Sequence, residues 1–327
     1  MDNYASVLHQ MEQFGVVFRD KDLPLVIDAP KRRTCGRGGK WWYWLRIFRP
    51  DAGGSFIVGR FGSYKHSTSE KVEVDWKPLG VNERARLDAE RKAAEERAET
   101  ARREESELAA LGAADLWRRA QPEGRSPYLE RKGVLGEACR YLGDTLVVPL
   151  LRYDMPRDQA LRAVQRIWPE GAKRFTKGFS KTGCCVRLGA LEGARMKLLL
   201  VCEGYATGLT LRMATEREFP VFVALDAYNL VAVVELLRGL YPHSFILVCA
   251  DDDWKSTDHV GSNPGCRHAR LAAKNTDSCE IVWPVFNDKT RQVKDTDFND
   301  LHQREGLDVV ARQLQRVTSL ILESLSD

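Results

Sequence analysis

Two short apolar runs that each end in acidic residues constrain this chain more than any other feature. The first run, residues 197–202, is followed by Glu203, and the second, residues 245–250, is followed by Asp251–Asp253. Apolar runs of this length, bounded by turn residues, are typical of buried parallel strands. In an open α/β sheet the ligand lies at the carboxyl ends of the strands. The pattern therefore predicts a parallel sheet with several carboxylates along one edge.

Carboxylates gathered at one edge point to a bound cation. They repel one another and raise each other's pKa unless a positive charge joins them. Hard oxygen ligands of this kind suit Mg²⁺ or Mn²⁺. The residues alone thus favour a divalent-metal site that acts on phosphates.

The surrounding sequence alternates between strand and helix patterns, which predicts a parallel sheet with right-handed crossovers. Asn263 and Pro264 favour a helix start. The tail, residues 307–325, has amphipathic spacing and is expected to close the domain or to reach a partner. The predicted order is strand 197–202, helix 206–216, strand 220–225, helix 229–239, strand 244–250, helix 264–276 and strand 279–285.

A locally basic segment lies directly before the acidic one. Residues 150–190 hold nine Lys or Arg against three acids, although the net charge of the 327 residues is only +4. Residues 144–151 and 161–168 read as an antiparallel pair of strands. The cations after them suit a loop that grips phosphates, and the plainer alternative is a solvated surface turn. The candidate phosphate-binding residues are Arg166, Lys173, Arg174, Lys177 and Lys181.

The first 78 residues form a unit rich in aromatic side chains. Residues 41–48 and 55–62 read as a β-hairpin that follows a basic, glycine-bearing loop. Interleaved basic and aromatic residues can stack nucleobases and hold phosphates. The alternative is that the aromatics fill a small core, and both readings can hold on opposite faces of the sheet. The candidate contacts are Arg37, Lys40, Trp42 and Trp44.

A run of Ala, Glu and Arg, residues 81–120, predicts one long solvated helix that links two domains.

The eight cysteines include no Cys-x-x-Cys pair, so neither a zinc ribbon nor a disulfide framework is expected. No signal peptide or run of membrane-spanning length is evident, which favours the cytoplasm and no membrane partner. The expected domains are residues 1–80, 81–120, 121–192 and 193–327.

The motif from Glu203 to Gly208, followed about 45 residues later by Asp251 and Asp253, resembles the Toprim domain. More narrowly, the sequence Glu-Gly-Tyr after an apolar strand resembles the corresponding motif of the bacterial DNA primases of plasmids, phages and mobile elements. Asp297 matches a further acidic position of those primases. That position is the first of an Asp-x-Asp motif in those primases. Asn299 stands at the second position, where an acid is expected, and Asp300 is expected to compensate. The zinc-binding module of the chromosomal primases is absent.

The resemblance implies an α/β Toprim domain, with a basic α+β subdomain before it and a small aromatic α+β domain at the N-terminus. It implies primer synthesis on single-stranded DNA from nucleoside triphosphates, by two Mg²⁺ or Mn²⁺ ions, with a separate replicative helicase. The implied catalytic residues are Glu203, Asp251 and Asp253, joined by Asp297 as metal ligands. A Toprim nuclease and a non-catalytic single-strand-binding accessory protein remain alternatives.

Overall fold

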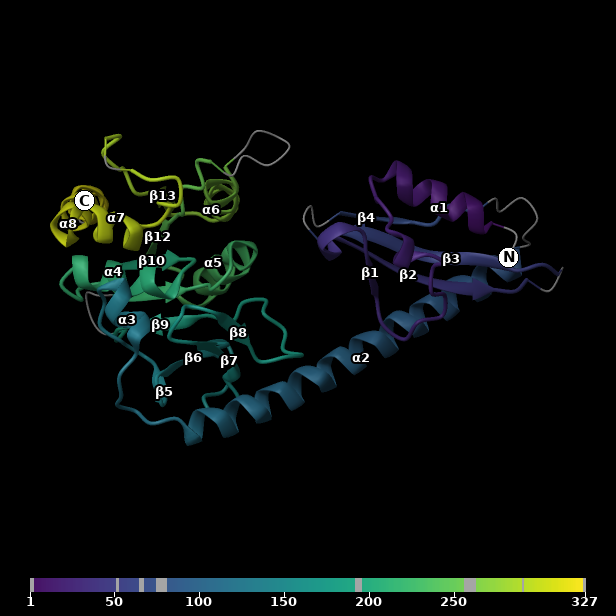
Figure 1. Cartoon of the computed structure of the whole chain (residues 1–327), viewed down its shortest axis with the longest axis horizontal. Coiled ribbons are helices and arrows are strands. Elements are labelled where there is room, and N and C mark those ends of the chain that lie inside the picture. The colour runs from purple at the N-terminus through teal and green to yellow at the C-terminus, as the bar shows by residue number, and fades with distance from the viewer. Residues whose placement is uncertain are drawn as a thin grey trace. The chain divides into compact units, whose positions relative to one another are not determined.

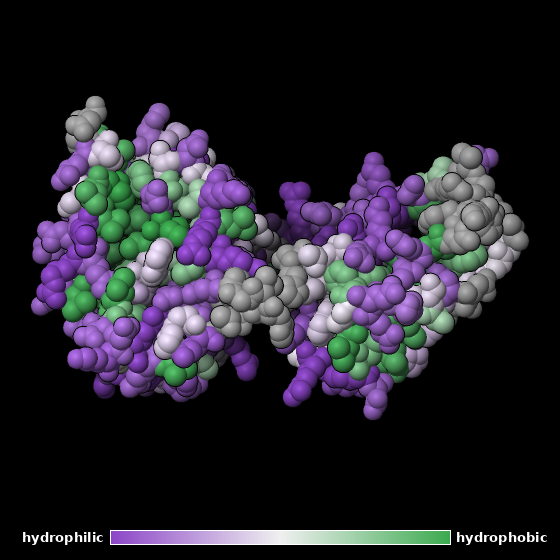
Figure 2. Space-filling view, turned by 90° about the horizontal axis from the view of Figure 1, so that it is seen from above, coloured by the Kyte–Doolittle hydropathy of each residue, from purple (hydrophilic) through white to green (hydrophobic). Residues whose placement is uncertain are grey.

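The chain forms two compact units, residues 1–103 and 104–327, in this computed structural model. The structure describes residues 3–50, 53–64, 68–74, 81–191, 196–255, 263–289 and 291–325. The domain boundaries expected at residue 80 and at residues 192–193 lie outside these ranges. No helix in the described part of the chain is long and apolar enough to cross a membrane. Hydrophilic side chains predominate on the face of each unit seen in Figure 2, and hydrophobic residues form smaller patches.

The first unit is an antiparallel sheet with a helix on one face (Figure 1). The sheet order is β1-β2-β3-β4. Alternate residues of the central strands, such as Tyr43 and Leu45, are buried against Val7 and Met11 of the helix. The elements are α1 (Tyr4–Gln13), β1 (Arg33–Cys35), β2 (Trp41–Phe48), β3 (Phe56–Ser63) and β4 (Thr68–Lys71).

The predicted charged helix is present as α2 (Val81–Arg119). Ion pairs one turn apart, such as Arg119 with Asp115 at 3.0 Å, stabilise the solvent-exposed side of this helix. Its few buried positions are small: Ala94 is 3 % exposed and Ala113 is 1 % exposed. Ala94 lies in the part of the helix that belongs to the first unit, and Ala113 in the part that belongs to the second. The helix therefore contributes to the packing of both units.

The second unit begins with an antiparallel sheet of order β5-β6-β7-β8. The predicted pairing of two strands is confirmed, with Val148 opposite Gln165. A short helix before the sheet begins with Pro at its first turn and ends at Gly133, which adopts a left-handed conformation. The elements are α3 (Pro127–Lys132), β5 (Arg140–Leu142), β6 (Thr145–Leu151), β7 (Leu161–Ile167) and β8 (Lys173–Phe175).

The predicted parallel sheet is also confirmed, in the order β13-β12-β10-β11-β9. All neighbours are parallel except β9, which is an antiparallel edge strand. Helices cover both faces, so the three central strands, β12, β10 and β11, are apolar throughout. The strands are β9 (Val186–Leu188), β10 (Leu198–Cys202), β11 (Val221–Val223), β12 (Phe245–Cys249) and β13 (Cys279–Val282); the helices are α4 (Tyr205–Ala214), α5 (Leu230–Leu240), α6 (Pro264–Lys274), α7 (Phe298–Glu305) and α8 (Leu307–Ser324).

Two local predictions hold in this unit. Asn263 caps α6 by accepting a hydrogen bond from the Cys266 amide. The amphipathic tail is α8, and it buries Val310, Leu314 and Ile321 in the core beside the sheet. All eight cysteines are free thiols, as expected.

Candidate active site

The two central strands deliver their acids to the same edge of the parallel sheet. In the register of β10 and β12, Cys202 lies opposite Cys249. Glu203 therefore follows the end of one strand directly, and Asp251 follows the end of its neighbour. Strand β11 lies on the other side of β10, so the chain crosses over β10 between β11 and β12. Such a change of direction in strand order is where α/β sheets bind ligands.

Asp297 joins this edge from a helix rather than a strand. It is the N-cap of α7, and one of its carboxylate oxygens accepts from the Asp300 amide at 2.7 Å. The other oxygen accepts from the Thr207 hydroxyl at 2.9 Å. Because Thr207 lies in the first turn of α4, just after Glu203, this bond ties α7 to the acidic edge.

Asp253 and Asp252 point to different partners. Asp253 accepts a hydrogen bond from the Gly265 amide at 3.1 Å, near the start of α6. Asp252 instead binds Arg291, with 2.7 Å between the guanidinium nitrogen and the carboxylate oxygen. Gly265 is required here, since a Cβ would lie 2.3 Å from the carbonyl oxygen of Asp251.

The acids at this edge act on one another electrostatically. Burial raises the pKa of Asp251 well above its ordinary range, and repulsion from Asp297, Glu203 and Asp253 adds to the shift. Burial, followed by repulsion from Asp226 and Asp253, raises the pKa of Glu203 to about 7. Burial and then the Asp300 carboxylate raise the pKa of Asp297. The charges of Glu203, Asp251, Asp253 and Asp297 therefore influence one another at this edge.

The donor set fits a hard divalent cation. One carboxylate oxygen of Asp251 is buried and has no hydrogen-bond partner. A buried acceptor without a donor is costly, and a cation would satisfy it. Within the described ranges no three His, Cys, Asp or Glu side chains already stand at metal-binding geometry. All the candidate donors are carboxylate oxygens, which Mg²⁺ and Mn²⁺ prefer.

Asn299, the departure from the family pattern, lies in the core rather than at this edge. Its side chain is fully buried. Its amide donates to the carbonyl of Lys132 at 2.9 Å and to the Thr210 hydroxyl at 3.0 Å. Asp300 is a capping residue, since its carboxylate accepts from the amides of Thr296 and Asp297.

The predicted cations separate onto two faces of the antiparallel sheet. Lys173 lies opposite Ile167, whereas its neighbour Arg174 lies opposite Arg166. Because side chains alternate along a strand, Lys173 shares a face with Ile167, which is part of the core beside the parallel sheet. Arg166 and Arg174 occupy the opposite face, where both guanidinium groups approach the ring of Trp168.

The charges of the acidic edge act on Lys173. Desolvation and then repulsion from Lys132 lower its pKa, while Asp297, Glu203 and Asp251 oppose the shift. Lys181 forms an ion pair with Asp226, which in turn caps the turn after β11. Lys177 is exposed.

Two residues that sequence reasoning did not single out also border this edge. The Tyr128 hydroxyl is buried without a hydrogen-bond partner, and its ring lies 5.7 Å from the Lys173 ammonium. Burial and then the Asp297 charge raise the pKa of Tyr128 to about 12. Lys132 lies 3.5 Å from the Asp300 carboxylate. Both belong to α3, a short helix without a motif, so no local signal could have linked them to the site.

The N-terminal candidates differ in accessibility. Trp42 is only 7 % exposed, and the guanidinium of Arg32 covers its ring at 4.1 Å. Trp44 is partly exposed, and Arg46 stacks on it at 4.5 Å. Arg37 and Lys40 are exposed in the turn between β1 and β2.

The fold and site define a class of protein: an α/β domain whose parallel sheet gathers carboxylates at its carboxyl edge, preceded by a basic α+β subdomain. The predicted architecture is confirmed. The chain is 30 % identical over 300 residues to DNA primase TraC of Escherichia coli, which covers 87 % of this chain and 26 % of that protein. The chain thus spans about a quarter of the length of this curated relative. The predicted kinship with bacterial DNA primases is confirmed.

More distant likenesses are found among solved structures, and no family model matches. The catalytic domain of the DnaG primase bound to single-stranded DNA shares 14 % identity, with a TM-score of 0.41 over 66 % of this chain and 80 % of that one. The zinc-binding and RNA polymerase domains of the Aquifex aeolicus primase share 12 %, with a TM-score of 0.39 over 88 % and 80 %. The primase fragment of the bacteriophage T7 primase-helicase shares 13 %, with a TM-score of 0.39 over 57 % and 69 %.

Proposed function

We propose that this chain is a DNA primase that synthesises short primers on single-stranded DNA, for the replication or transfer of a mobile element. The observation that carries the proposal is the set of mutually repelling carboxylates, Glu203, Asp251, Asp253 and Asp297, at the carboxyl edge of the sheet. It gains weight from the 30 % identity to a primase along most of the chain. The proposed setting is the cytoplasm, with a separate helicase as partner.

In this proposal Asp251, Asp253 and Asp297 hold two Mg²⁺ or Mn²⁺ ions, and Glu203 lies next to the attacking 3′-hydroxyl as a ligand or base. The bound cations would lower the pKa of that hydroxyl and neutralise charge on the incoming triphosphate. A carboxylate whose pKa is about 7 is suited to accept a proton near neutral pH.

Lys173 is the proposed phosphate-positioning residue. It shares a sheet face with Ile167 of the core, and the charges of Asp297, Glu203 and Asp251 act on its pKa. A cation opposite a carboxylate site can hold the triphosphate in line for attack. Arg166 and Arg174, on the other face of the sheet, remain proposed contacts for the template backbone, together with Lys177 and Lys181.

The decisive assay combines purified protein, a single-stranded template, Mg²⁺ or Mn²⁺ and labelled ribonucleotides. We expect primers from the wild type and none from Asp251→Ala or Glu203→Ala, while both variants still bind single-stranded DNA. Full synthesis by both variants would overturn the site assignment. Cleavage of the template would favour a nuclease, and binding without either reaction would favour an accessory protein.

A further inference from the structure

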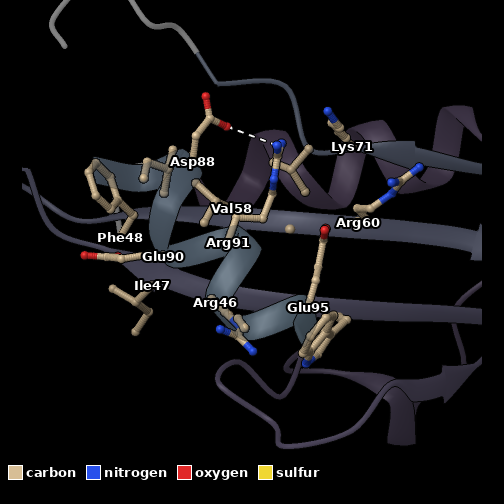
Figure 3. Close-up of a pocket in the computed structure, with 15 residues that line it drawn as sticks. Arg46, Ile47, Phe48, Val58, Arg60, Lys71, Asp88, Glu90, Arg91 and Glu95 are labelled. Atoms are coloured by element: carbon tan, nitrogen blue, oxygen red, sulfur yellow. Dashed lines mark ion pairs between the residues drawn. The ribbon is translucent and has the colours of Figure 1, made fainter. Parts of the chain in front are cut away.

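A groove in the first unit has no role in the proposed reaction. It lies between the sheet face that carries Trp44 and the first part of α2, and its central pocket has a volume of about 150 Å³ (Figure 3). A second hollow shares Arg60 with this pocket, and a third hollow shares Lys71 with it. The groove therefore continues beyond the central pocket in both directions. We call it the sheet–helix groove, and it is shaped chiefly by Trp44, Val58, Arg60, Lys71, Ala94 and Glu95.

An aromatic ring and two cations form a row across the sheet side of this groove. Trp44 pairs with Arg60, and Arg60 pairs with Lys71, in neighbouring strands. Residues directly opposite in a sheet share a face, so the three side chains follow one another at steps of ~4.8 Å. Base stacking and phosphate binding need this combination of a ring with adjacent cations.

Among the described residues, no carboxylate forms an ion pair with either cation, Arg60 or Lys71. Arg60 donates to the Ser69 hydroxyl at 3.0 Å, and its Nε is buried without a hydrogen-bond partner. Like charges directly opposite each other destabilise a sheet. The pair is therefore suited to an anion that is shared between them.

The helix side of the groove supplies a carboxylate that can accept hydrogen bonds. Arg91 is neutralised by Asp88 at 3.2 Å, the ion pair drawn in Figure 3. Glu95 is exposed and lines the central pocket together with Trp44. An ionised carboxylate only accepts hydrogen bonds, and the exocyclic amino groups of adenine, cytosine and guanine can donate one. Thymine has no such group.

We infer that the sheet–helix groove binds single-stranded DNA and takes one unpaired, amino-bearing base into its central pocket. The base stacks on Trp44 and donates to Glu95, and the flanking phosphates lie against Arg60 and Lys71. The inference rests on the proposed function only for the class of partner, single-stranded DNA. It selects Trp44, which is partly exposed, over Trp42, which is only 7 % exposed, and it does not use the exposed Arg37 and Lys40.

The charge requirement is tested by fluorescence anisotropy with a labelled single strand, in EDTA and without nucleotides. We expect R60Q/K71Q to bind about tenfold more weakly, and the slope of log affinity against log salt to fall by about 1.4, the value for two lost phosphate contacts. The full-length R37Q/K40Q variant is the matched control, because it loses the same charge outside the groove and should change affinity less than threefold. An equal loss in both variants would overturn the inference.

The pocket itself is tested by one substitution that leaves the charge unchanged and by a second that removes Glu95. Ala94→Leu adds bulk to the lining that Ala94 shares with Trp44, so we expect at least tenfold weaker binding of single strands and unchanged binding of duplex. The wild type should prefer oligo(dC) to oligo(dT), and Glu95→Ala should remove that preference. Unchanged single-strand affinity in Ala94→Leu, or no base preference in the wild type, would overturn the base pocket. These are binding measurements, so they stand even if primer synthesis is not observed.

Discussion

Asn299 donates its side-chain amide to the main-chain carbonyl of Lys132 at 2.9 Å, which fixes α7 against the end of α3. The same amide reaches the Thr210 hydroxyl on α4. Because the Lys132 carbonyl can only accept, an acidic side chain at position 299 would face that oxygen without a hydrogen bond to it. Asn299 is thus a packing residue in this chain.

We expect Asn299→Asp to lower the free energy of unfolding by roughly 3 kcal/mol, because it places an uncompensated charge in the core. Urea unfolding followed by circular dichroism measures this change. Gln303→Ala is the control, since it removes a more exposed bond to the same carbonyl and should cost less than ~1 kcal/mol. Improved Mg²⁺-dependent synthesis by Asn299→Asp would contradict the packing role.

Asp251→Asn should separate stability from function. Asp251 is held beside Asp297 and Glu203 with its pKa raised, so its ionised form is unfavourable in the absence of a cation. We expect the variant to unfold at a higher temperature than the wild type in EDTA, and to lose primer synthesis. Added Mg²⁺ should raise the melting temperature of the wild type only. A lower melting temperature of the variant in EDTA would argue against repulsion at this edge.

The metal-free protein should lose stability as pH rises. The folded-state pKa of Glu203 is about 7, above its ordinary value of 4.5. A raised pKa means that the folded state binds the proton more tightly, so its contribution is complete below pH 4.5 and is lost as pH rises through 7. Thermal unfolding in EDTA should show this slope, and saturating Mg²⁺ should flatten it. Glu203→Gln, which cannot titrate, should show a weaker slope in EDTA.

Lys173 and Arg174 are sequence neighbours on opposite faces of β8, and their substitution should have different effects. We expect Lys173→Ala to reduce kcat/KM for nucleotides on the order of 100-fold, because it removes a cation beside the acidic edge. Arg174→Ala should leave incorporation on saturating template nearly unchanged and weaken only template binding. Steady-state primer synthesis at varied nucleotide and template concentrations separates the two effects. Equal kcat/KM losses for nucleotides would mean that the alternation of faces does not decide their roles.

Asp22 should stabilise the first unit in a pH-dependent way. Its carboxylate accepts from the guanidinium of Arg19 at 2.7 Å and from the Gly36 amide at 2.9 Å. The Arg19 bond holds the pKa of Asp22 well below its ordinary value of 3.8, so its stabilisation is present above that pH and is lost as pH falls further. Asp22→Asn should cost about 2 kcal/mol at pH 7 and progressively less below pH 4. An unchanged difference at pH 3, measured by chemical unfolding, would contradict this account.

The hydrophobic periodicity of strands and helices, and the acids that end the apolar runs, depend only on neighbouring residues and can be read from the sequence. They determined the parallel sheet, its order of elements, the long α2 and the placement of Glu203 and Asp251 at one edge. The Asn263 cap and the amphipathic α8 are equally local. The expectation of free thiols was also local, because it required only the positions of the eight cysteines in the sequence.

Only the tertiary structure decided which of these residues meet. A one-residue step along β8 puts Lys173 and Arg174 on opposite faces, and the sequence contains no signal for which face looks toward the acids. Tyr128 and Asn299 acquired their surroundings from segments far along the chain. The sheet–helix groove arises because α2 lies over β2, β3 and β4, a packing that a charged helix with few apolar residues does not predict. Local preferences fix the elements, whereas register and long-range packing decide which side chains form a site.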